Sequence, residues 1–259
     1  MVDSFQELLQ FIEEKTAFQC HGYKPKPLIR RIRVRMRSLN IKEFSDYLIY
    51  LRQHPDELSK LLDILTINLS YFYRNPETFE YMSRELIPQI ADRPKLCFWS
   101  AGCAHGEEAY SLALLASEAG ILDKTEIFGT DIDRDAIQKA AKGSYPDLAL
   151  QYLPRILRTK YFTEGDGACE INGSMRKAVR FMVHDLFTSP PFPPCDLVMC
   201  RNVLIYMDRA AQSKIMCNLH GQLKSGGYLA IGKVELLLGV PEVQLFQLIS
   251  RGEHIFRKT

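Results

Sequence analysis

The sequence lacks the features that mark a secreted, membrane-spanning or disordered protein. Its seven cysteines contain no C-x-x-C pair, so we expect buried thiols in a reducing compartment and neither a disulfide framework nor a metal site. Because no apolar run is long enough to span a membrane and no signal peptide precedes the first helical pattern, we expect a soluble, cytoplasmic protein without direct membrane insertion. With 46% hydrophobic and 25% charged residues, the composition is that of a folded protein.

The net charge is small, and the histidines form no catalytic pattern. The formal net charge is only +2 over 259 residues, so no overall field points to nucleic acid. The six histidines are scattered and form no His–Asp or Cys–His pattern typical of nucleophilic catalysis. A chain of this length is expected to fold into one or two domains with a sizeable core.

The most informative stretch runs over residues 96–115. It begins with an apolar run typical of a buried strand, passes through a loop with Gly102 and Gly106, and enters a helical apolar pattern at Glu107. A strand, a glycine loop and a helix form the first unit of a nucleotide-binding α/β domain, because glycine lets the backbone pass close to a ligand. The G-x-x-x-G spacing, followed at once by Glu107 and Glu108, is not the dinucleotide fingerprint.

The paired acids after the loop indicate the kind of ligand. The helix dipole favours them at a helix N-terminus, but they would repel a pyrophosphate bound there. S-adenosylmethionine (AdoMet), with its amino group, sulfonium and ribose diol, suits them better. The alternative is that Glu107 and Glu108 simply begin the helix, and the loop alone does not decide between the two interpretations.

Two aspartates follow a second predicted strand at residues 125–130. Asp131 lies 25 residues beyond Gly106, near the place where nucleotide-binding α/β folds put the acid that accepts hydrogen bonds from ribose hydroxyls. Either aspartate could instead cap the helix predicted from residue 136 to 142. We assign Asp131 mainly to the ribose and Asp133 mainly to the cap.

The first 65 residues carry helical patterns and no strand signal, with helices expected at residues 3–15, 28–39, 42–53 and 56–65. The second of these has an apolar stripe with arginines on its two flanks, Arg30, Arg33 and Arg37 on one and Arg31 and Arg35 on the other. No acid lies among them, and like charges this close repel one another. We therefore favour a docking surface for an acidic partner over a merely solvated face.

Four motifs occur in one order along the chain: Asn-Leu-Ser-Tyr-Phe-Tyr-Arg at 68–74, Trp-Ser-Ala-Gly-Cys-Ala-His-Gly-Glu-Glu-Ala-Tyr-Ser at 99–111, Asp-Ile-Asp at 131–133, and Cys-Arg-Asn-Val-Leu-Ile-Tyr at 200–206. Together they resemble the CheR family of chemotaxis protein methyltransferases, which esterify receptor glutamates with AdoMet. The resemblance covers nearly the whole chain. Ala109 stands where the family often has proline, and His105 where Ser or Thr is common, but neither change removes a charged group.

The resemblance implies an α/β fold, namely a Rossmann-like class I methyltransferase sheet with a small antiparallel β insertion, preceded by an all-helical N-terminal domain. We place the receptor-docking helical domain at residues 1–66, a linker and helix at 67–92, and the AdoMet-binding domain at 93–259, with the small β-subdomain at about 146–178. Further strands are expected at residues 179–183, 195–200 and 228–232, and a closing hairpin at 241–248 and 253–257.

The resemblance also implies functional residues. Arg74 and Tyr206 would align the acceptor carboxylate, as an arginine fork and a phenol can do; the alternatives are a structural ion pair and a tyrosine at the edge of the core. Because glutamate, with a reference pKa of about 4.3, is already ionised at neutral pH, no general base is needed. Contacts to AdoMet or its product S-adenosylhomocysteine are expected from Asn68, Ser70, Arg74, Gly102, Glu108, Asp131, Asp185, Leu186, Asn202 and Val203.

The implied partner is the cytoplasmic helical bundle of a chemoreceptor, bound by a monomer through Arg30, Arg33 and Arg37. Because the segment between Phe162 and Val179 is short, we expect docking without a receptor tail peptide. Two alternatives are a non-catalytic AdoMet-sensing adaptor and a nucleic-acid methyltransferase. The second is disfavoured, because Arg-Asn-Val-Leu stands where amino-methylating enzymes typically have Asn/Asp-Pro-Pro-Tyr.

Overall fold

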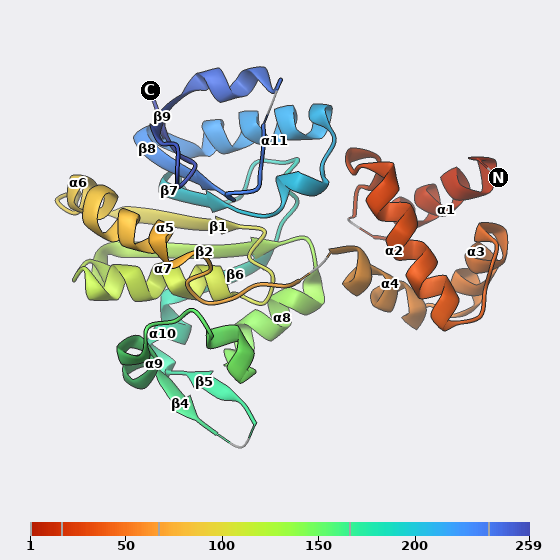
Figure 1. Ribbon diagram of the computed structural model, residues 1–259, viewed down its shortest axis with the longest axis horizontal. Coiled ribbons are helices and arrows are strands. Elements are labelled where there is room, and N and C mark those ends of the chain that lie inside the picture. Colours follow the sequence, from red (N-terminus) through yellow and green to blue (C-terminus); the bar gives the residue numbers. More distant parts are fainter. Residues whose placement is uncertain (1, 17, 67, 166, 238) are drawn as a thin grey trace.

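A seven-stranded sheet with the strand order β6-β2-β1-β7-β8-β10-β9 organises the larger part of the molecule (Figure 1). The computed structural model describes residues 2–16, 18–66, 68–165, 167–237 and 239–259. The strands are β1 (Leu96–Ala101), β2 (Thr125–Asp131), β6 (Val179–Val183), β7 (Cys195–Cys200), β8 (Leu223–Ile231), β9 (Phe246–Ser250) and β10 (Ile255–Lys258). Neighbours among the first five are parallel, whereas β10 runs antiparallel to both β8 and β9. The predicted mixed sheet is confirmed.

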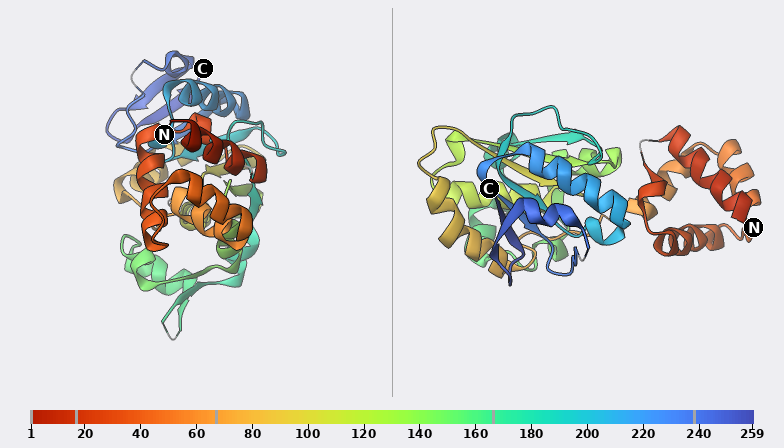
Figure 2. Two further views of the ribbon diagram at one scale, coloured as in Figure 1. Left: turned by 90° about the vertical axis from the view of Figure 1, so that its right-hand side faces the viewer. Right: turned by 90° about the horizontal axis from the view of Figure 1, so that it is seen from above.

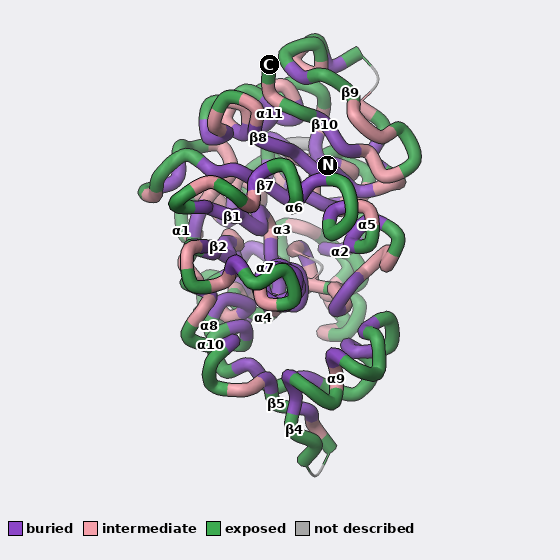
Figure 3. The backbone as a smooth tube through the Cα atoms, turned by 90° about the vertical axis from the view of Figure 1, so that its left-hand side faces the viewer, coloured by how far each residue is buried: buried purple, intermediate pink, exposed green. Residues whose placement is uncertain are grey.

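Helices cover both faces of this sheet, which explains why β1 and β7 are buried along their whole length. Successive side chains of β1 enter opposite cores: Phe98 packs on the side of α7 (Glu107–Glu118), and Trp99 on the side of α11 (Arg209–Gln222). Figure 3 shows the buried backbone concentrated along these strands. The carboxyl ends of the parallel strands therefore form the edge at which polar side chains emerge from an apolar layer.

The end of the chain departs from prediction at two elements. β8 begins at Leu223, five residues before the expected residue 228, and pairs with β7 across an irregular register. The predicted strand at 241–248 is wrong for its first half, because Pro241–Leu245 forms a 3-10 helix and β9 begins only at Phe246. Pro241 has no N–H to donate to a strand ladder, and it suits the first position of a helical turn.

The small antiparallel insertion is confirmed as a three-stranded sheet in the order β3-β5-β4. Its strands are β3 (Ser144–Tyr145), β4 (Phe162–Glu164) and β5 (Cys169–Ile171), accompanied by α9 (Arg155–Tyr161); α8 (Arg134–Lys142) precedes it and α10 (Gly173–Ala178) follows it. Phe72 packs edge-on against Tyr145 at 4.8 Å and Phe162 at 5.0 Å between ring centroids. The subdomain is thus anchored to the segment that leads into the larger domain.

The N-terminal residues form a separate helical unit with its own core, at the end of the molecule that faces the carboxyl ends of the parallel strands (Figures 1 and 2). Its elements are α1 (Val2–Lys15), a 3-10 turn (Cys20–Gly22), α2 (Pro25–Ser38), α3 (Phe44–Gln53) and α4 (Asp56–Thr66). The four expected helices are confirmed, although α2 begins three residues early, with Pro25 at its first position. None of the helices in the described residues is long and apolar enough to cross a membrane.

The connecting helix is α5 (Pro76–Tyr81), a π-helical turn (Met82–Leu86) and α6 (Ile87–Ile90), one after the other. These elements lie within the stretch 67–92, for which a linker and a helix were predicted. Pro88 lacks the N–H that a regular helix would require, and this accounts for the irregular hydrogen bonding of the preceding turn.

Candidate functional site

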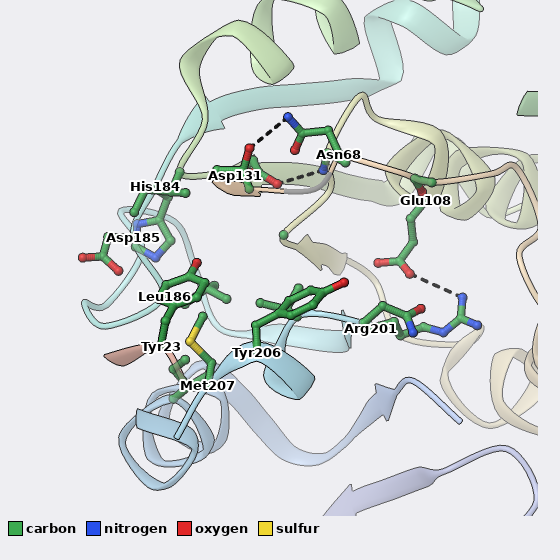
Figure 4. Close-up of a pocket in the computed structure, with 18 of the residues that line it drawn as sticks. Tyr23, Asn68, Glu108, Asp131, His184, Asp185, Leu186, Arg201, Tyr206 and Met207 are labelled. Atoms are coloured by element: carbon green, nitrogen blue, oxygen red, sulfur yellow. Dashed lines mark hydrogen bonds and ion pairs between the residues drawn. The ribbon is translucent and has the colours of Figure 1, made fainter. Parts of the chain in front are cut away.

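A pocket lies at the carboxyl ends of β1, β2, β6 and β7, beneath the helical domain. Its empty volume is about 920 Å³, a figure that includes open solvent at the mouth. Its lining includes Tyr206 and all ten residues predicted to contact AdoMet, namely Asn68, Ser70, Arg74, Gly102, Glu108, Asp131, Asp185, Leu186, Asn202 and Val203. In Figure 4, Asp185 and Leu186 lie at one end of this pocket and Glu108 at the other.

The two adjacent glutamates at the start of α7 have different surroundings. Glu108 lines the pocket, accepts a hydrogen bond from Ser100 Oγ at 2.8 Å and pairs with Arg201 Nη1 at 3.4 Å. Burial raises its pKa, and Arg201 opposes that shift. Glu107 is buried away from the pocket, with Oε2 lacking a partner, and burial raises its pKa to about 7. Of the two acids, only Glu108 is placed to meet a ligand.

The two aspartates after β2 also differ. Asp133 caps α8 by accepting the N–H groups of Asp135 and Ala136, as predicted, and its other oxygen accepts from Asn68 Nδ2 at 2.7 Å. Asp131 lines the pocket and accepts the N–H groups of Ala104 at 2.9 Å and Asp133 at 3.0 Å. Burial raises the pKa of Asp131 to about 6. Since a carboxylate has about four acceptor sites, Asp131 keeps room for ligand hydroxyls.

The loop after β7 is held in an unusual backbone conformation. Asn202 has φ +62°, a left-handed value that is uncommon for a residue with a side chain. Glu235 fixes the loop by accepting the N–H groups of Val203 at 2.9 Å and Leu204 at 2.7 Å. A Cβ at Gly232 would lie 2.8 Å from the Glu235 carboxylate, so the glycine leaves room for that side chain. Gly232 and Glu235 do not themselves line the pocket.

The opposite wall depends on Gly102. Its φ of +80° favours glycine, and a Cβ there would lie 2.5 Å from Val203 Cγ2. The glycine loop and the Asn202 loop are therefore in direct contact, and Val203 occupies the space that a side chain at residue 102 would need.

Arg74 and Tyr206 both face the pocket. Arg74 is half-buried and donates to the carbonyl of Leu69 at 3.3 Å, and no acid in the described residues forms an ion pair with it. The alternative of a structural ion pair therefore finds no support. Tyr206 is also half-buried, and the guanidinium of Arg31 lies 4.4 Å from its ring centroid. Figure 4 shows its phenol directed toward the Glu108 side of the pocket.

The arginines of α2 divide into two groups. Arg30, Arg33 and Arg37 are exposed. Arg31 is buried and donates to the carbonyl of Leu65, and Arg35 pairs with Glu57 of α4 at 2.6 Å. The expectation that all five lack acidic partners is wrong for Arg35, because its partner comes from another helix.

Several lining residues were not predicted. Most of these are sequence neighbours of predicted residues, such as Ala104, Ile132, His184, Arg201 and Met207. Others come from the helical domain, which contributes Gln19, Tyr23 and Thr66. No local pattern marks these three, since only the folding of that domain against the sheet brings them to the pocket.

The residues at the pocket match the chemistry of AdoMet. Carboxylates lie where an amino group and a ribose diol could be bound, at Glu108 and Asp131, and apolar side chains, including Leu186 and Val203, line part of the remaining wall. Together with the mixed sheet, this set of side chains defines a class I AdoMet-dependent methyltransferase. The family model "CheR methyltransferase, SAM binding domain" matches residues 68–252, and "CheR methyltransferase, all-alpha domain" matches residues 3–66. The chain belongs to the CheR family of chemotaxis methyltransferases, and its cofactor is AdoMet.

Relatives support the same assignment. The putative methyltransferase Cher3 of Pseudomonas putida is 30% identical over 260 residues, covering 97% of this chain and 95% of that protein. The chemotaxis protein methyltransferase of Listeria innocua is 31% identical over 228 residues, with 87% of each chain covered. An uncharacterized 104.1 kDa protein of Rhodobacter capsulatus is 35% identical over 243 residues, covering 91% of this chain, which spans 25% of that larger protein.

Proposed function

We propose that this protein transfers a methyl group from AdoMet to glutamate side chains of chemoreceptors, giving the methyl esters used in chemotactic adaptation. The observation that carries the proposal is that Arg74 and Tyr206 face the same pocket as the cofactor residues, and that Arg74 keeps a cationic group without an internal acid. Bound AdoMet supplies an electrophilic methyl group, and an ionised glutamate is a sufficient nucleophile. The chain's own contribution is then to position the acceptor.

The charges around Arg74 favour an anionic acceptor. Glu108 is neutralised by Arg201, which also donates to the carbonyl of Arg74 at 2.8 Å and to Asn75 Oδ1 at 2.6 Å. The Arg74 guanidinium thus adds positive charge beside a pair that already compensates itself. A glutamate entering the mouth of the pocket would meet this guanidinium and the phenol of Tyr206, which together fix its orientation.

The exposed arginines of α2 supply the proposed receptor surface. Arg30, Arg33 and Arg37 face solvent, while Arg31 of the same helix contacts Tyr206. An acidic helical bundle lying on α2 would therefore reach the pocket mouth by a short path. Such steering raises association rates and weakens with salt.

The central test uses AdoMet labelled in its methyl group, offered with a receptor cytoplasmic fragment, with DNA and with RNA. We expect label on the receptor alone, released as methanol by mild alkali because glutamate methyl esters hydrolyse. Binding of AdoMet without any transfer would instead indicate the sensing adaptor, and labelled nucleic acid would indicate the other alternative. Arg74→Ala should lower transfer far more than affinity for S-adenosylhomocysteine, and near-normal turnover in that variant would remove its proposed role.

The docking surface has its own test. Reversal of Arg30, Arg33 and Arg37 to glutamate should abolish receptor methylation and leave cofactor affinity unchanged. A matched control reverses three exposed cations elsewhere, Lys95, Arg155 and Arg251, with the same change of net charge. Equal methylation by both variants, or a strict need for a receptor tail peptide, would contradict direct docking on α2.

A further inference from the structure

The segment Gln19–Lys24 of the helical domain is joined to the pocket by main-chain hydrogen bonds. Lys24 N donates to the Tyr206 carbonyl at 2.9 Å, and Asp208 N donates to the Gly22 carbonyl at 3.0 Å. Between them, Tyr23 and Met207 form an isolated antiparallel bridge. Backbone groups therefore hold this part of the helical domain against the pocket wall.

The same segment also touches the loop after β6. A Cβ on Gly22 would lie 2.6 Å from the ring of Phe187, so the absence of a side chain lets the two segments meet. Asp185 in turn accepts the N–H of Phe187 at 2.9 Å. The backbone next to Tyr23 is thus in contact with both loops that border one end of the pocket.

Tyr23 is half-buried at this junction and lines the pocket. Its ring packs on Phe18, with 4.6 Å between centroids, and it contacts apolar residues of both the helical core and the sheet core. Figure 4 places it beside Leu186 and Met207, at the end opposite Glu108. No hydrogen bond reaches its hydroxyl from any residue that the structure describes. A phenol packed by its ring and left unpaired at its tip has a donor available for a ligand.

We propose that the Tyr23 hydroxyl donates a hydrogen bond to the adenosine half of bound AdoMet, so that the helical domain is part of the cofactor site. Burial raises the pKa of the Tyr23 phenol, and the charges of Asp131 and Asp185 add to this shift, so the hydroxyl stays protonated as a donor. The inference rests on AdoMet binding and does not depend on which protein side chain is methylated.

The test is calorimetric binding of S-adenosylhomocysteine to the full chain and to Tyr23→Phe. This change keeps the ring packing and the main-chain bridge and removes only the donor, so we expect binding about 3- to 10-fold weaker, the usual size of one net hydrogen bond. Tyr50→Phe is the matched control, because Tyr50 stacks on His54 within the helical domain and does not line the pocket. Unchanged affinity in Tyr23→Phe, or an equal loss in Tyr50→Phe, would overturn the proposal.

A second ligand locates the contact. Methylthioadenosine carries the adenosine half and lacks the amino-acid half of the cofactor. Its affinity should fall in Tyr23→Phe by the same factor as that of S-adenosylhomocysteine. A loss confined to S-adenosylhomocysteine would place the contact at the amino-acid end and refute the inference. Because neither measurement uses a receptor, their outcome is separate from that of the methylation assays.

Discussion

A buried carboxylate lies at each end of the central sheet, and the two differ in whether cations pair with them. At the amino ends of β1 and β7, Asp196 is fully buried and accepts from Arg93 at 2.5 Å, Lys224 at 2.7 Å and Cys97 N at 2.8 Å. At the carboxyl end of β2, Asp131 accepts two backbone N–H groups, and no cation in the described residues pairs with it.

This difference distinguishes a carboxylate that stabilises the fold from one that can still bind a ligand. The chain itself satisfies Asp196, so that carboxylate can only stabilise the fold. Asp131 is left with spare acceptor sites and a raised pKa, a cost that a ligand can relieve. The single tryptophan, Trp99, is buried in β1 between these two ends and allows unfolding to be followed by fluorescence.

The largest expected effect is on stability. Asp196→Asn removes the charge that two cations and a backbone N–H share, and we expect the free energy of unfolding in urea to fall by about 3 kcal/mol. The affinity of the folded variant for S-adenosylhomocysteine should stay within about twofold of wild type. A twofold change in affinity corresponds to only a few tenths of a kcal/mol. Unchanged stability would show that the two ends of the sheet do not differ as argued.

The reciprocal change acts on affinity. Asp131→Asn should weaken S-adenosylhomocysteine binding about 30-fold, or about 2 kcal/mol, because hydrogen bonds to a charged acceptor are worth more than those to an amide. Stability at neutral pH should fall by no more than about 1 kcal/mol, because the loss of a buried charge that folding disfavours offsets the loss of one of the two backbone N–H bonds that the carboxylate accepts. A large loss of stability with little loss of affinity would instead place Asp131 in the same class as Asp196.

Acidification should sharpen the contrast. The pKa of Asp131 is about 6, so its carboxyl becomes protonated below that value and loses acceptor capacity. Affinity for S-adenosylhomocysteine should therefore fall about tenfold between pH 7.5 and pH 5 and level off above pH 7. His184 and Asp185 also line the pocket, and the control is Asp131→Asn, whose affinity should be nearly flat over this range. A slope retained in that variant would assign the titration to another group.

The smallest expected effect concerns Glu107, whose carboxyl group is buried away from the pocket and so cannot be stabilised by a bound ligand. Its pKa in the folded protein is about 7, well above that of an exposed glutamate, so ionisation opposes folding as the pH rises through 7 and has no effect near pH 4. Glu107→Gln should stabilise the protein by roughly 1 kcal/mol at pH 8.5, and the gain should shrink toward pH 5. Urea unfolding at both pH values measures this, and a gain independent of pH would exclude ionisation as its cause.

Local patterns predicted the elements that position the site. The apolar run before Gly102, the helical pattern from Glu107 and the capping role of Asp133 each depend on a few neighbouring residues, and the structure confirms them. The strand predicted to begin at residue 241 is wrong because Pro241 has no N–H for a strand ladder, and this outweighs the apolar pattern around it.

What local patterns could not predict depends on contacts between distant segments. The pairing of Arg35 with Glu57, the binding of Arg201 to Glu108 and the position of Tyr23 at the pocket each join residues from separate elements. A pattern within one stretch of sequence therefore reveals only one of the two partners in each interaction. The individual roles assigned to the pocket residues and to the exposed arginines remain predictions until the variants are measured.

The main-chain bonds between residues 22–24 and 206–208 have a consequence for evolution. Because they use backbone groups, the helical domain keeps its position on the pocket whatever side chains its outer surface carries. Arg30, Arg33 and Arg37 can be replaced without moving Tyr23 or Tyr206. If α2 is the docking surface proposed above, descendants of this chain could change the partner that they recognise through substitutions on one face of that helix, while the residues of the pocket stay the same.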